Sequence, residues 1–327
     1  SSSFDQSVVS WLKYRFRWEV SPDWITHSPG VVTSIITAIL AYTHPGDKIL
    51  IQSPVYYPFY SCVTTNDREL VINPLQLQGD SYLIDFDDLE NKLRRGVKMM
   101  ILCSPHNPVG RVWKEAELTQ LAGLCSQYQV MLVSDEIHGD LIYPGHQQIS
   151  IASLSEKPAQ NSVTLISPTK TFNLAGLAES VAIIPNPKLR HQFQQTLRKT
   201  GAGMLNIFGM VAGEAAYAHG APWLEELLRY LDLNRQTLVE YFQTNIPRIK
   251  LFKPEGTYLA WLDCRELGIA PGELKEFFVQ QTGVGLNDGS IFGTDGAGFQ
   301  RINFACPRSL LMEGLQRIEK AVNKLKS

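Results

Sequence analysis

The segment "SVTLISPTKTFNLAGL", residues 162–177, joins a short apolar run to a polar turn that carries a single lysine. The run "SVTLI" predicts a strand, because it is short, continuous and rich in β-branched residues. A lone lysine after a strand is usually a solvated surface residue. An amine held at such a strand end can instead form an imine with a carbonyl compound. The neighbours of Lys170 decide between these two interpretations.

Similar apolar runs precede and follow this segment. They predict strands at 48–54, 97–105, 130–136, 162–168 and 180–186, and helical spacing between the strands predicts helices at 31–47, 86–96 and 114–129. The strand runs are continuous and do not alternate with polar residues, which favours a sheet buried on both faces. We therefore predict an α/β fold whose mostly parallel sheet is sandwiched by helices.

The chain beyond residue 187 has a different pattern. Helical spacing dominates as far as about residue 245, and strands are then predicted at 257–263, 283–288 and 299–305, with an amphipathic helix at the end. This pattern predicts a smaller α+β C-terminal domain. We expect residues 22–225 to form the large domain, and residues 1–21 and 226–327 to form the small one.

The composition excludes several classes of function. A net charge of −2 in 327 residues gives no electrostatic attraction to nucleic acid or to an anionic membrane. No apolar run is long enough to span a bilayer. The five cysteines lack the CxxC spacing of a zinc site and are odd in number, so we expect no metal and reduced thiols in a cytoplasmic protein. They are Cys62, Cys103, Cys125, Cys264 and Cys306.

Polar residues follow four of the predicted strands, in "SPVYYPFY", "SPHNPVG", "SDEIHGD" and "SPTK". In open parallel sheets, ligands bind beyond the carboxyl ends of the strands, so these segments are expected to converge. They supply Asn107, Asp135, Ser167 and Lys170, and Gly30 opens a helix whose N-terminal amides suit a phosphate. An amine, an acid, an amide, a hydroxyl and a phosphate cradle are the groups that bind pyridoxal 5′-phosphate (PLP).

Each of these residues also has an ordinary structural explanation. Asn107 before Pro108 is a good turn residue, Asp135 could cap the next segment, and a single histidine such as His138 is more often structural. Tyr56 could be a core aromatic residue. The joint placement of these residues at strand ends favours the functional interpretation.

Seven motifs, in order and along nearly the whole chain, resemble one family. They are "SPVYYPFY", "CSPHNPVGRVW", "SDEIHGDL", "KTFNLAGL", "GAPWLEELLRYL", "TYLAWLD" and "RINFACPRS". The chain resembles the fold-type I PLP enzymes of the aminotransferase superfamily, and within them the MalY/PatB group of cystathionine β-lyases, or C–S lyases. The resemblance implies a homodimer with active sites at the interface.

The resemblance also implies a role for each residue. Lys170 would hold the cofactor aldehyde and move protons, Asp135 would pair with the pyridinium, and Arg301 would bind the substrate carboxylate through its guanidinium fork. Arg308 is a lower-ranked rival for this last role, because it lies past the strand at a predicted helix start. The remaining expected contacts are Asn107 and His138 to the ring hydroxyl oxygen, Tyr56 against the ring and beside the substrate, and Gly30, Val31, Val32 and Ser167 to the phosphate.

The implied reaction is β-elimination from cystathionine or a related cysteine S-conjugate, which yields a thiol, pyruvate and ammonia. The alternatives are an aminotransferase of the same superfamily and a regulatory protein that keeps the fold. Ala178 and His138 stand where many aminotransferases have arginine and tyrosine, and these two differences match the C–S lyases. Family members also carry an earlier segment whose tyrosine reaches the neighbouring subunit's phosphate. We expect activity to depend on that segment.

Overall fold

The computed structural model describes residues 2–325. In this part of the chain the largest sheet has seven strands in the order β1-β9-β8-β7-β6-β2-β3. The strands β2 to β8 of this sheet pair in parallel, β9 is antiparallel to β8, and β1 is antiparallel to β9. The predicted mostly parallel sheet is confirmed. The strands are β1 (Ile25–Ser28), β2 (Lys48–Ser53), β3 (Glu69–Pro74), β6 (Val97–Cys103), β7 (Met131–Asp135), β8 (Ser162–Ile166) and β9 (Ser180–Ile183).

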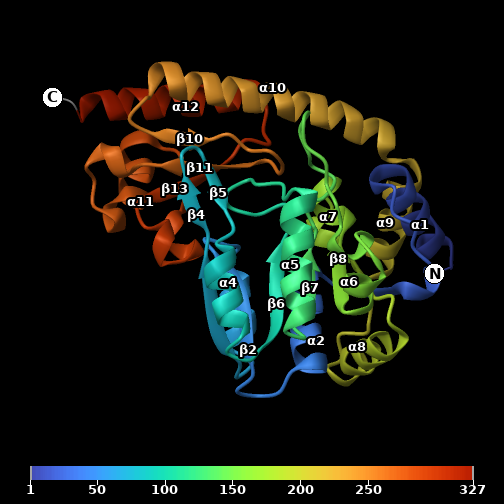
Figure 1. The fold of residues 1–327 in the computed structure, drawn as a ribbon. Helices are drawn as coiled ribbons and strands as arrows, with labels where there is room; N and C mark the ends of the chain where they lie inside the picture. Colours follow the sequence, from blue (N-terminus) through green and yellow to red (C-terminus); the bar gives the residue numbers. More distant parts are fainter. Residues whose placement is uncertain (1, 326–327) are drawn as a thin grey trace.

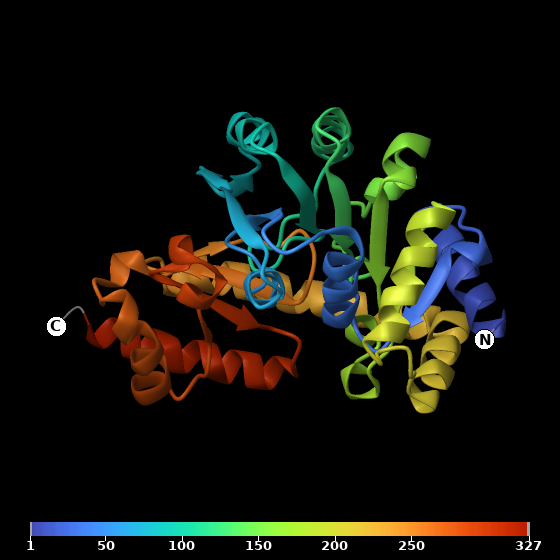
Figure 2. The same cartoon turned by 90° about the horizontal axis from the view of Figure 1, so that it is seen from below.

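Helices cover both faces of this sheet (Figures 1 and 2). One core forms between the sheet and α2, α3 and α8, and a second core on the opposite face includes α4 and α5. Successive strand residues alternate between these cores, as Leu50 and Ile51 do, because side chains alternate across a strand. The helices are α2 (Val31–Tyr42), α3 (Pro58–Thr64), α4 (Phe86–Leu93), α5 (Glu115–Gln127), α6 (Glu156–Gln160) and α8 (Pro187–Lys199).

The C-terminal part forms a second sheet, antiparallel, in the order β10-β11-β13-β12. Its strands are β10 (Lys250–Phe252), β11 (Leu259–Asp263), β12 (Asn287–Asp288) and β13 (Phe299–Asn303), with α11 (Leu274–Phe277) and α12 (Arg308–Lys324) beside them. The prediction of a strand at 283–288 is therefore correct only for its last two residues, Asn287 and Asp288. Residues 278–282 form a helical turn, and Gly283 ends it with φ of 68°, a conformation that favours glycine.

The long helix α10 (Ala221–Asn245) runs along one side of the whole molecule (Figure 1). It connects the small sheet to α1 (Ser2–Phe16) and α9 (Ile207–His219), which pack together at the other end. The expected domain boundary at residue 225 falls inside α10, and the division into two domains stays a prediction. Within residues 2–325, no helix is long and apolar enough to cross a membrane.

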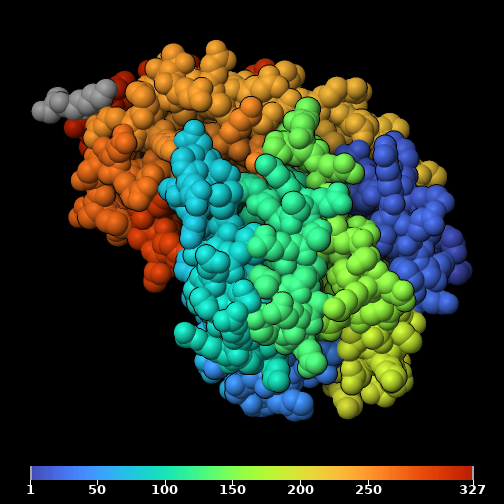
Figure 3. All heavy atoms as spheres, viewed as in Figure 1, coloured from blue at the N-terminus to red at the C-terminus, as the bar shows by residue number. Residues whose placement is uncertain are grey.

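The hairpin of β4 (Gln76–Gln78) and β5 (Ser81–Leu83) lies beside the small sheet (Figure 1), and in Figure 3 this cyan segment touches the orange C-terminal part. Lys250 of β10 pairs with Asp80 at 2.6 Å, and the indole of Trp261 donates to the hydroxyl of Tyr82 at 3.2 Å. These contacts fix the small sheet beside the large one.

Arg111 joins three segments near the same junction. Its buried guanidinium pairs with Glu117 of α5 at 2.9 Å and with Glu255 before β11 at 3.1 Å, and it donates to the carbonyl of Tyr82. The turn between Asn107 and Arg111 is thereby held against the small sheet. Arg111 therefore supports a loop that carries a predicted site residue.

Replacing Arg111 should destabilise the fold. We expect Arg111→Ala to lower the free energy of unfolding by about 2–3 kcal/mol, because two half-buried carboxylates lose their partner. Urea denaturation followed by circular dichroism measures this loss. The exposed Arg94→Ala is the control and should leave the unfolding midpoint nearly unchanged. Equal effects of the two substitutions would contradict the account.

Candidate active site

A cavity of about 550 Å³ opens at the carboxyl ends of the parallel strands. Its wall combines β6, β7 and β8 of the large sheet with β11 and β13 of the small one. Most of the predicted site residues line it, and these are Gly30, Val31, Val32, Tyr56, Asn107, Asp135, His138, Lys170 and Arg301. The residues predicted at the four strand ends therefore converge on this one cavity, with the exception of Ser167.

Lys170 and Asp135 lie at the carboxyl ends of neighbouring strands, and both line the cavity. Asp135 ends β7 and pairs in register with Leu165 of β8, and Lys170 lies in the short helix α7 (Pro168–Thr171) that follows β8. The Asp135 side chain accepts a hydrogen bond from the Ile137 amide at 3.1 Å. Burial raises the pKa of Asp135 to about 7, although the Ile137 amide and Lys170 act to lower it. A carboxylate with so few partners is suited to a cationic ligand group.

Arg301 is oriented by two amides. Its Nη1 donates to Asn107 Oδ1 and its Nη2 to Asn287 Oδ1, each at 2.8 Å, and its guanidinium lies 4.6 Å from the ring centre of Phe292. Its Nε is buried and has no partner among the described residues. Both amide contacts are neutral, so the guanidinium keeps its full charge for an anion in the cavity.

His138 and Tyr56 also line this cavity. The His138 ring meets Tyr258 edge-on at 5.6 Å, and its Nδ1 is buried without a partner in the described structure. Burial lowers the pKa of His138 to about 3, with Lys170 and Arg301 acting in the same direction. The imidazole is therefore neutral and has a ring nitrogen available to a ligand. Burial also raises the pKa of Tyr56 to about 12, so its hydroxyl stays protonated.

The first turn of α2 forms one end of the cavity. Gly30 is its N-cap, no side chain caps it, and a Cβ placed on Gly30 would meet no atom within 4 Å. The first-turn amides of α2 therefore have no side-chain cap, and the space beside Gly30 is open, which suits an anion. Ser167 does not line the cavity. Its hydroxyl donates to the carbonyl of Glu179 at 2.6 Å and caps α7 by accepting from the Thr169 amide, and its phosphate contact stays a prediction.

Sequence reasoning missed several lining residues. They include Thr169, Glu179, Tyr258 and Asn303 of β13. Thr169 lies inside the "SPTK" motif, and this position could have identified it. Tyr258 and Asn303 come from the small sheet, whose approach to the large one has no sequence signal. Arg308 lies at the start of α12 and bonds Asn234 at 3.3 Å, outside this cavity, as its lower ranking anticipated.

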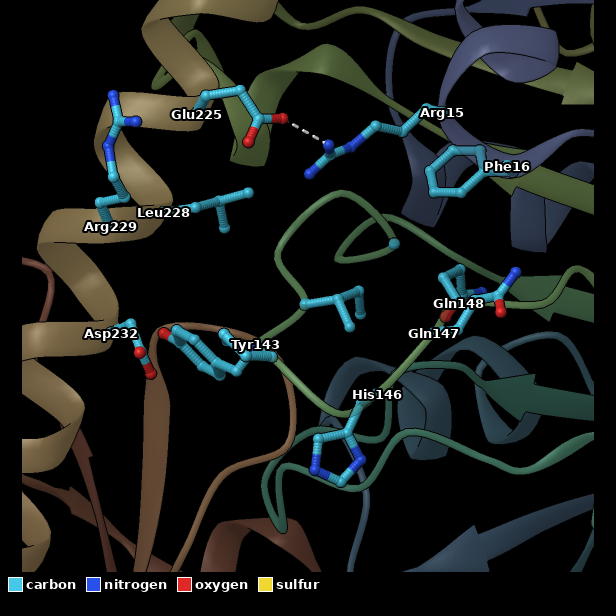
Figure 4. A pocket seen from close by; sticks show the side chains of 13 residues that line it. Arg15, Phe16, Tyr143, His146, Gln147, Gln148, Glu225, Leu228, Arg229 and Asp232 are labelled. Carbon is cyan, nitrogen blue, oxygen red and sulfur yellow. Dashed lines mark hydrogen bonds and ion pairs between the residues drawn. The ribbon is translucent and has the colours of Figure 1, made fainter.

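Another cavity lies between α1, the loop at 139–148 and α10 (Figure 4). Its charged groups are already paired. Arg15 contacts Glu225 at 2.6 Å, and Asp232 contacts Arg235 at 2.5 Å. None of the predicted site residues lines it, so the cavity at Lys170 is the better candidate for chemistry.

Comparison with known proteins supplies independent information. The family model for aminotransferases of class I and II matches residues 2–318. The chain is 43% identical over 318 residues to cystathionine β-lyase PatB of Bacillus subtilis (strain 168), covering 97% of this chain and 82% of PatB. It is 30% identical over 328 residues to protein MalY of Escherichia coli (strain K12), covering 100% of this chain and 83% of MalY.

A solved structure agrees closely with this fold. Cystalysin from Treponema denticola, whose crystal contains a pyridoxal 5′-phosphate cofactor, is 37% identical with a TM-score of 0.97. The match covers 99% of this chain and 83% of cystalysin. The similarity therefore includes both sheets and the cavity between them.

The buried Asp135 should lower the stability of the ligand-free chain. In the folded chain the pKa of Asp135 is about 7, above the ordinary 3.8. The resulting loss in the free energy of unfolding is therefore complete above pH 7, and it disappears as the pH falls toward 4. We expect Asp135→Asn to raise the free energy of unfolding by roughly 2–4 kcal/mol at pH 8 and by little at pH 4. Urea denaturation at both values measures this. The exposed Asp87→Asn should show no such trend, and a pH-independent effect at Asp135 would contradict the account.

Proposed function

Because the chain belongs to the class I and II aminotransferase family, we propose that it is a PLP-dependent C–S β-lyase acting on cystathionine or a related cysteine S-conjugate. The resemblance to the MalY/PatB group is confirmed by the matches to both proteins. The observation that carries the proposal is one cavity that holds an amine, a buried carboxylate and an oriented guanidinium, from Lys170, Asp135 and Arg301.

The residues of the cavity fit PLP. The α2 N-terminus with open space at Gly30 suits the phosphate, and buried Asp135 suits a protonated pyridine nitrogen. The His138 Nδ1, which has no partner within the described residues, suits the ring hydroxyl oxygen. These residues would hold the group, with Lys170 bonded to its aldehyde. Bound there, PLP supplies an aldehyde that captures the substrate amine and a ring that withdraws electrons from Cα.

The residues of the chain then divide the work. Arg301 binds the substrate carboxylate, and Asn107 and Asn287 hold its guanidinium in place. Lys170 removes the proton from the substrate Cα, as a general base positioned in the cavity. Asp135, whose pKa burial raises to about 7, would be held in its charged form by a protonated pyridine nitrogen, and the neutral His138 adds no competing positive charge.

The reaction balances without an oxidant or reductant. The Cα–H and Cβ–S bonds break, the sulfur leaves as a thiol, and water releases the remaining three carbons as pyruvate and ammonia. With cystathionine the thiol is homocysteine. A carboxylate-binding arginine selects amino acids, and a sulfur substituent on Cβ supplies the leaving group.

We also infer that the chain acts as a homodimer. The support is an exposed apolar patch at the start of α9, because monomers seldom expose contiguous apolar surface of this kind. It comprises Met204, Ile207, Phe208 and Val211, which are 63–86% exposed. A cytoplasmic location stays a prediction, supported only by the composition and the five free cysteines.

Pyruvate release tests the proposed activity. With PLP and cystathionine, and with no keto acid added, the chain should release pyruvate and homocysteine in equal amounts. Lys170→Ala should lower this rate by at least about 10²-fold, because it removes the base and the covalent anchor. An aminotransferase would instead need a keto acid and would form no thiol. No pyruvate from cystathionine or any cysteine S-conjugate would contradict the proposal.

The Asn287 contact should affect substrate binding more than chemistry. We expect Asn287→Ala to raise KM by about tenfold at nearly unchanged kcat, because the loss of a charged hydrogen bond loosens Arg301. Initial rates of pyruvate formation give both constants. Ser290→Ala, on the next turn, is the control. A fall in kcat at constant KM would show that Asn287 does not act through carboxylate binding.

A further inference from the structure

The short helix that carries Lys170 is held at both of its ends by buried hydroxyl groups. α7 has only four residues, and a helix of this length is not stable without contacts to the rest of the fold. At its start, the hydroxyl of Ser167 caps the helix. At its end, Thr171 donates a hydrogen bond from Oγ1 to Asp140 Oδ2 at 2.9 Å, and both of these side chains are buried. The place of the Lys170 backbone therefore depends on two anchors, one on each side.

Asp140 links the end of α7 to the distant helix α1. Its Oδ1 accepts a hydrogen bond from the indole nitrogen of Trp11 at 3.0 Å and lies 3.8 Å from Arg15 Nε. Arg15 also donates from Nη2 to the backbone carbonyl of Asp140 at 3.2 Å. The Trp11 ring meets Phe172, the residue that follows α7, edge-on at 5.7 Å. Each carboxylate oxygen of Asp140 thus has a partner, as a buried charge requires, and the partner of Oδ2 is Thr171.

The backbone around Asp140 is fixed by hydrogen bonds to two other segments. The Leu141 amide donates to the carbonyl of His138 at 2.9 Å and closes a turn around Asp140. The Leu141 carbonyl accepts from the amide of Thr257, which precedes β11, at 2.7 Å. The carboxylate of Asp140 is therefore a fixed point, and the hydrogen bond from Thr171 places the end of α7 against it.

Asp140 and Thr171 act on Lys170 and not directly on a ligand. Lys170 lines the cavity, but neither Asp140 nor Thr171 is among the described residues that do so. Burial raises the pKa of Asp140 to about 6, although the hydrogen bond from Thr171 and its other partners act to lower it. At pH 8 this carboxyl group is therefore charged, and both of its oxygens accept hydrogen bonds.

We propose that Asp140 and Thr171 are positioning residues that direct the amine of Lys170 toward the aldehyde of the cofactor. This inference rests on the proposed function. In the step concerned, the Lys170 nitrogen bonds to the aldehyde carbon, the carbonyl oxygen leaves as water, and neither an oxidant nor a reductant is needed. A displacement of about 1 Å can slow such a reaction by up to 10²-fold. Thr171 directly follows Lys170, so a shift of its backbone passes to the amine.

Covalent capture of PLP measures the position of the amine without any catalytic turnover. The ligand-free chain is mixed with saturating PLP at pH 8, samples are reduced with borohydride at successive times, and the pyridoxyl group on Lys170 is quantified by mass spectrometry. Thr171→Val keeps the shape of the side chain but removes the hydroxyl, and it should slow the labelling of Lys170 by about tenfold. Thr171→Ser keeps the hydroxyl and should label at nearly the wild-type rate.

Thr43→Val is the matched control, because it makes the same change at a buried threonine elsewhere. Thr43 Oγ1 donates to the carbonyl of Ile39 at 2.6 Å and accepts from Arg68 Nε at 2.9 Å. Thr43 caps the C-terminal end of α2, whereas the N-terminal end at Gly30 lines the cavity. This variant should lower the midpoint of urea denaturation as Thr171→Val does, but it should leave the labelling rate of Lys170 unchanged.

Pyridoxine 5′-phosphate, which has an alcohol in place of the aldehyde, is the control ligand. By calorimetry it should bind wild type and Thr171→Val equally. Equal labelling rates for these two proteins would overturn the inference, and so would parallel losses of labelling and of pyridoxine 5′-phosphate binding.

Two further variants decide the question should Thr171→Val fail to fold. The amide of Asp140→Asn can accept from Trp11 and donate to Thr171 Oγ1, so this variant should label Lys170 faster than Asp140→Ala does. Equal rates for the two variants would overturn the inference. Failure of wild type to form any label on Lys170 would instead refute the proposed function.

Discussion

The site depends on the common direction of the parallel strands. Because β6, β7 and β8 run the same way, their last residues meet at one edge, and the segments that follow them carry Asn107, Asp135 and Lys170. No single segment of the chain contains the site. The helix α2 adds its N-terminus at the same edge, and the small sheet closes the opposite wall with Arg301. The chemistry therefore requires the whole sheet.

Burial determines the charge of each group in this cavity. It favours the neutral forms of Asp135 and His138, and it leaves Arg301 with only neutral amide partners. Such a site is destabilising when empty, because a buried carboxylate without a cation is unfavourable. A cofactor with a cationic ring, an anionic phosphate and an aldehyde complements these features. The stability that the fold gives up at the site is recovered when the ligand binds.

The sequence revealed the large sheet and most of the site for a definite physical reason. Parallel strands buried on both faces appear as continuous apolar runs, and the polar residues that end them stand out, as in "SPTK". The small sheet was harder to predict. β12 has only two residues, Asn287 and Asp288, and the run before it is broken by Gly283. Short antiparallel strands depend on their partners more than on their own sequence.

Glu179 shows a different limit of sequence analysis. It lines the cavity but was overlooked, because its side chain contacts His27, which lies more than 150 residues away in the chain. Ser167 was assigned to the phosphate by resemblance, yet its hydroxyl bonds the backbone of Glu179. Such pairings follow from the packing of β1 against β9, where β1 is an edge strand of four residues with little sequence signal.

The central claim is that the amine of Lys170 bonds covalently to the cofactor aldehyde. The most direct measurement is to incubate the chain with PLP, reduce the imine with borohydride, digest the protein and locate the pyridoxyl group by mass spectrometry. The account predicts that the label lies on Lys170 in the peptide containing "SPTKTFNLAGL". A label spread over other lysines, or an unlabelled Lys170, would contradict it.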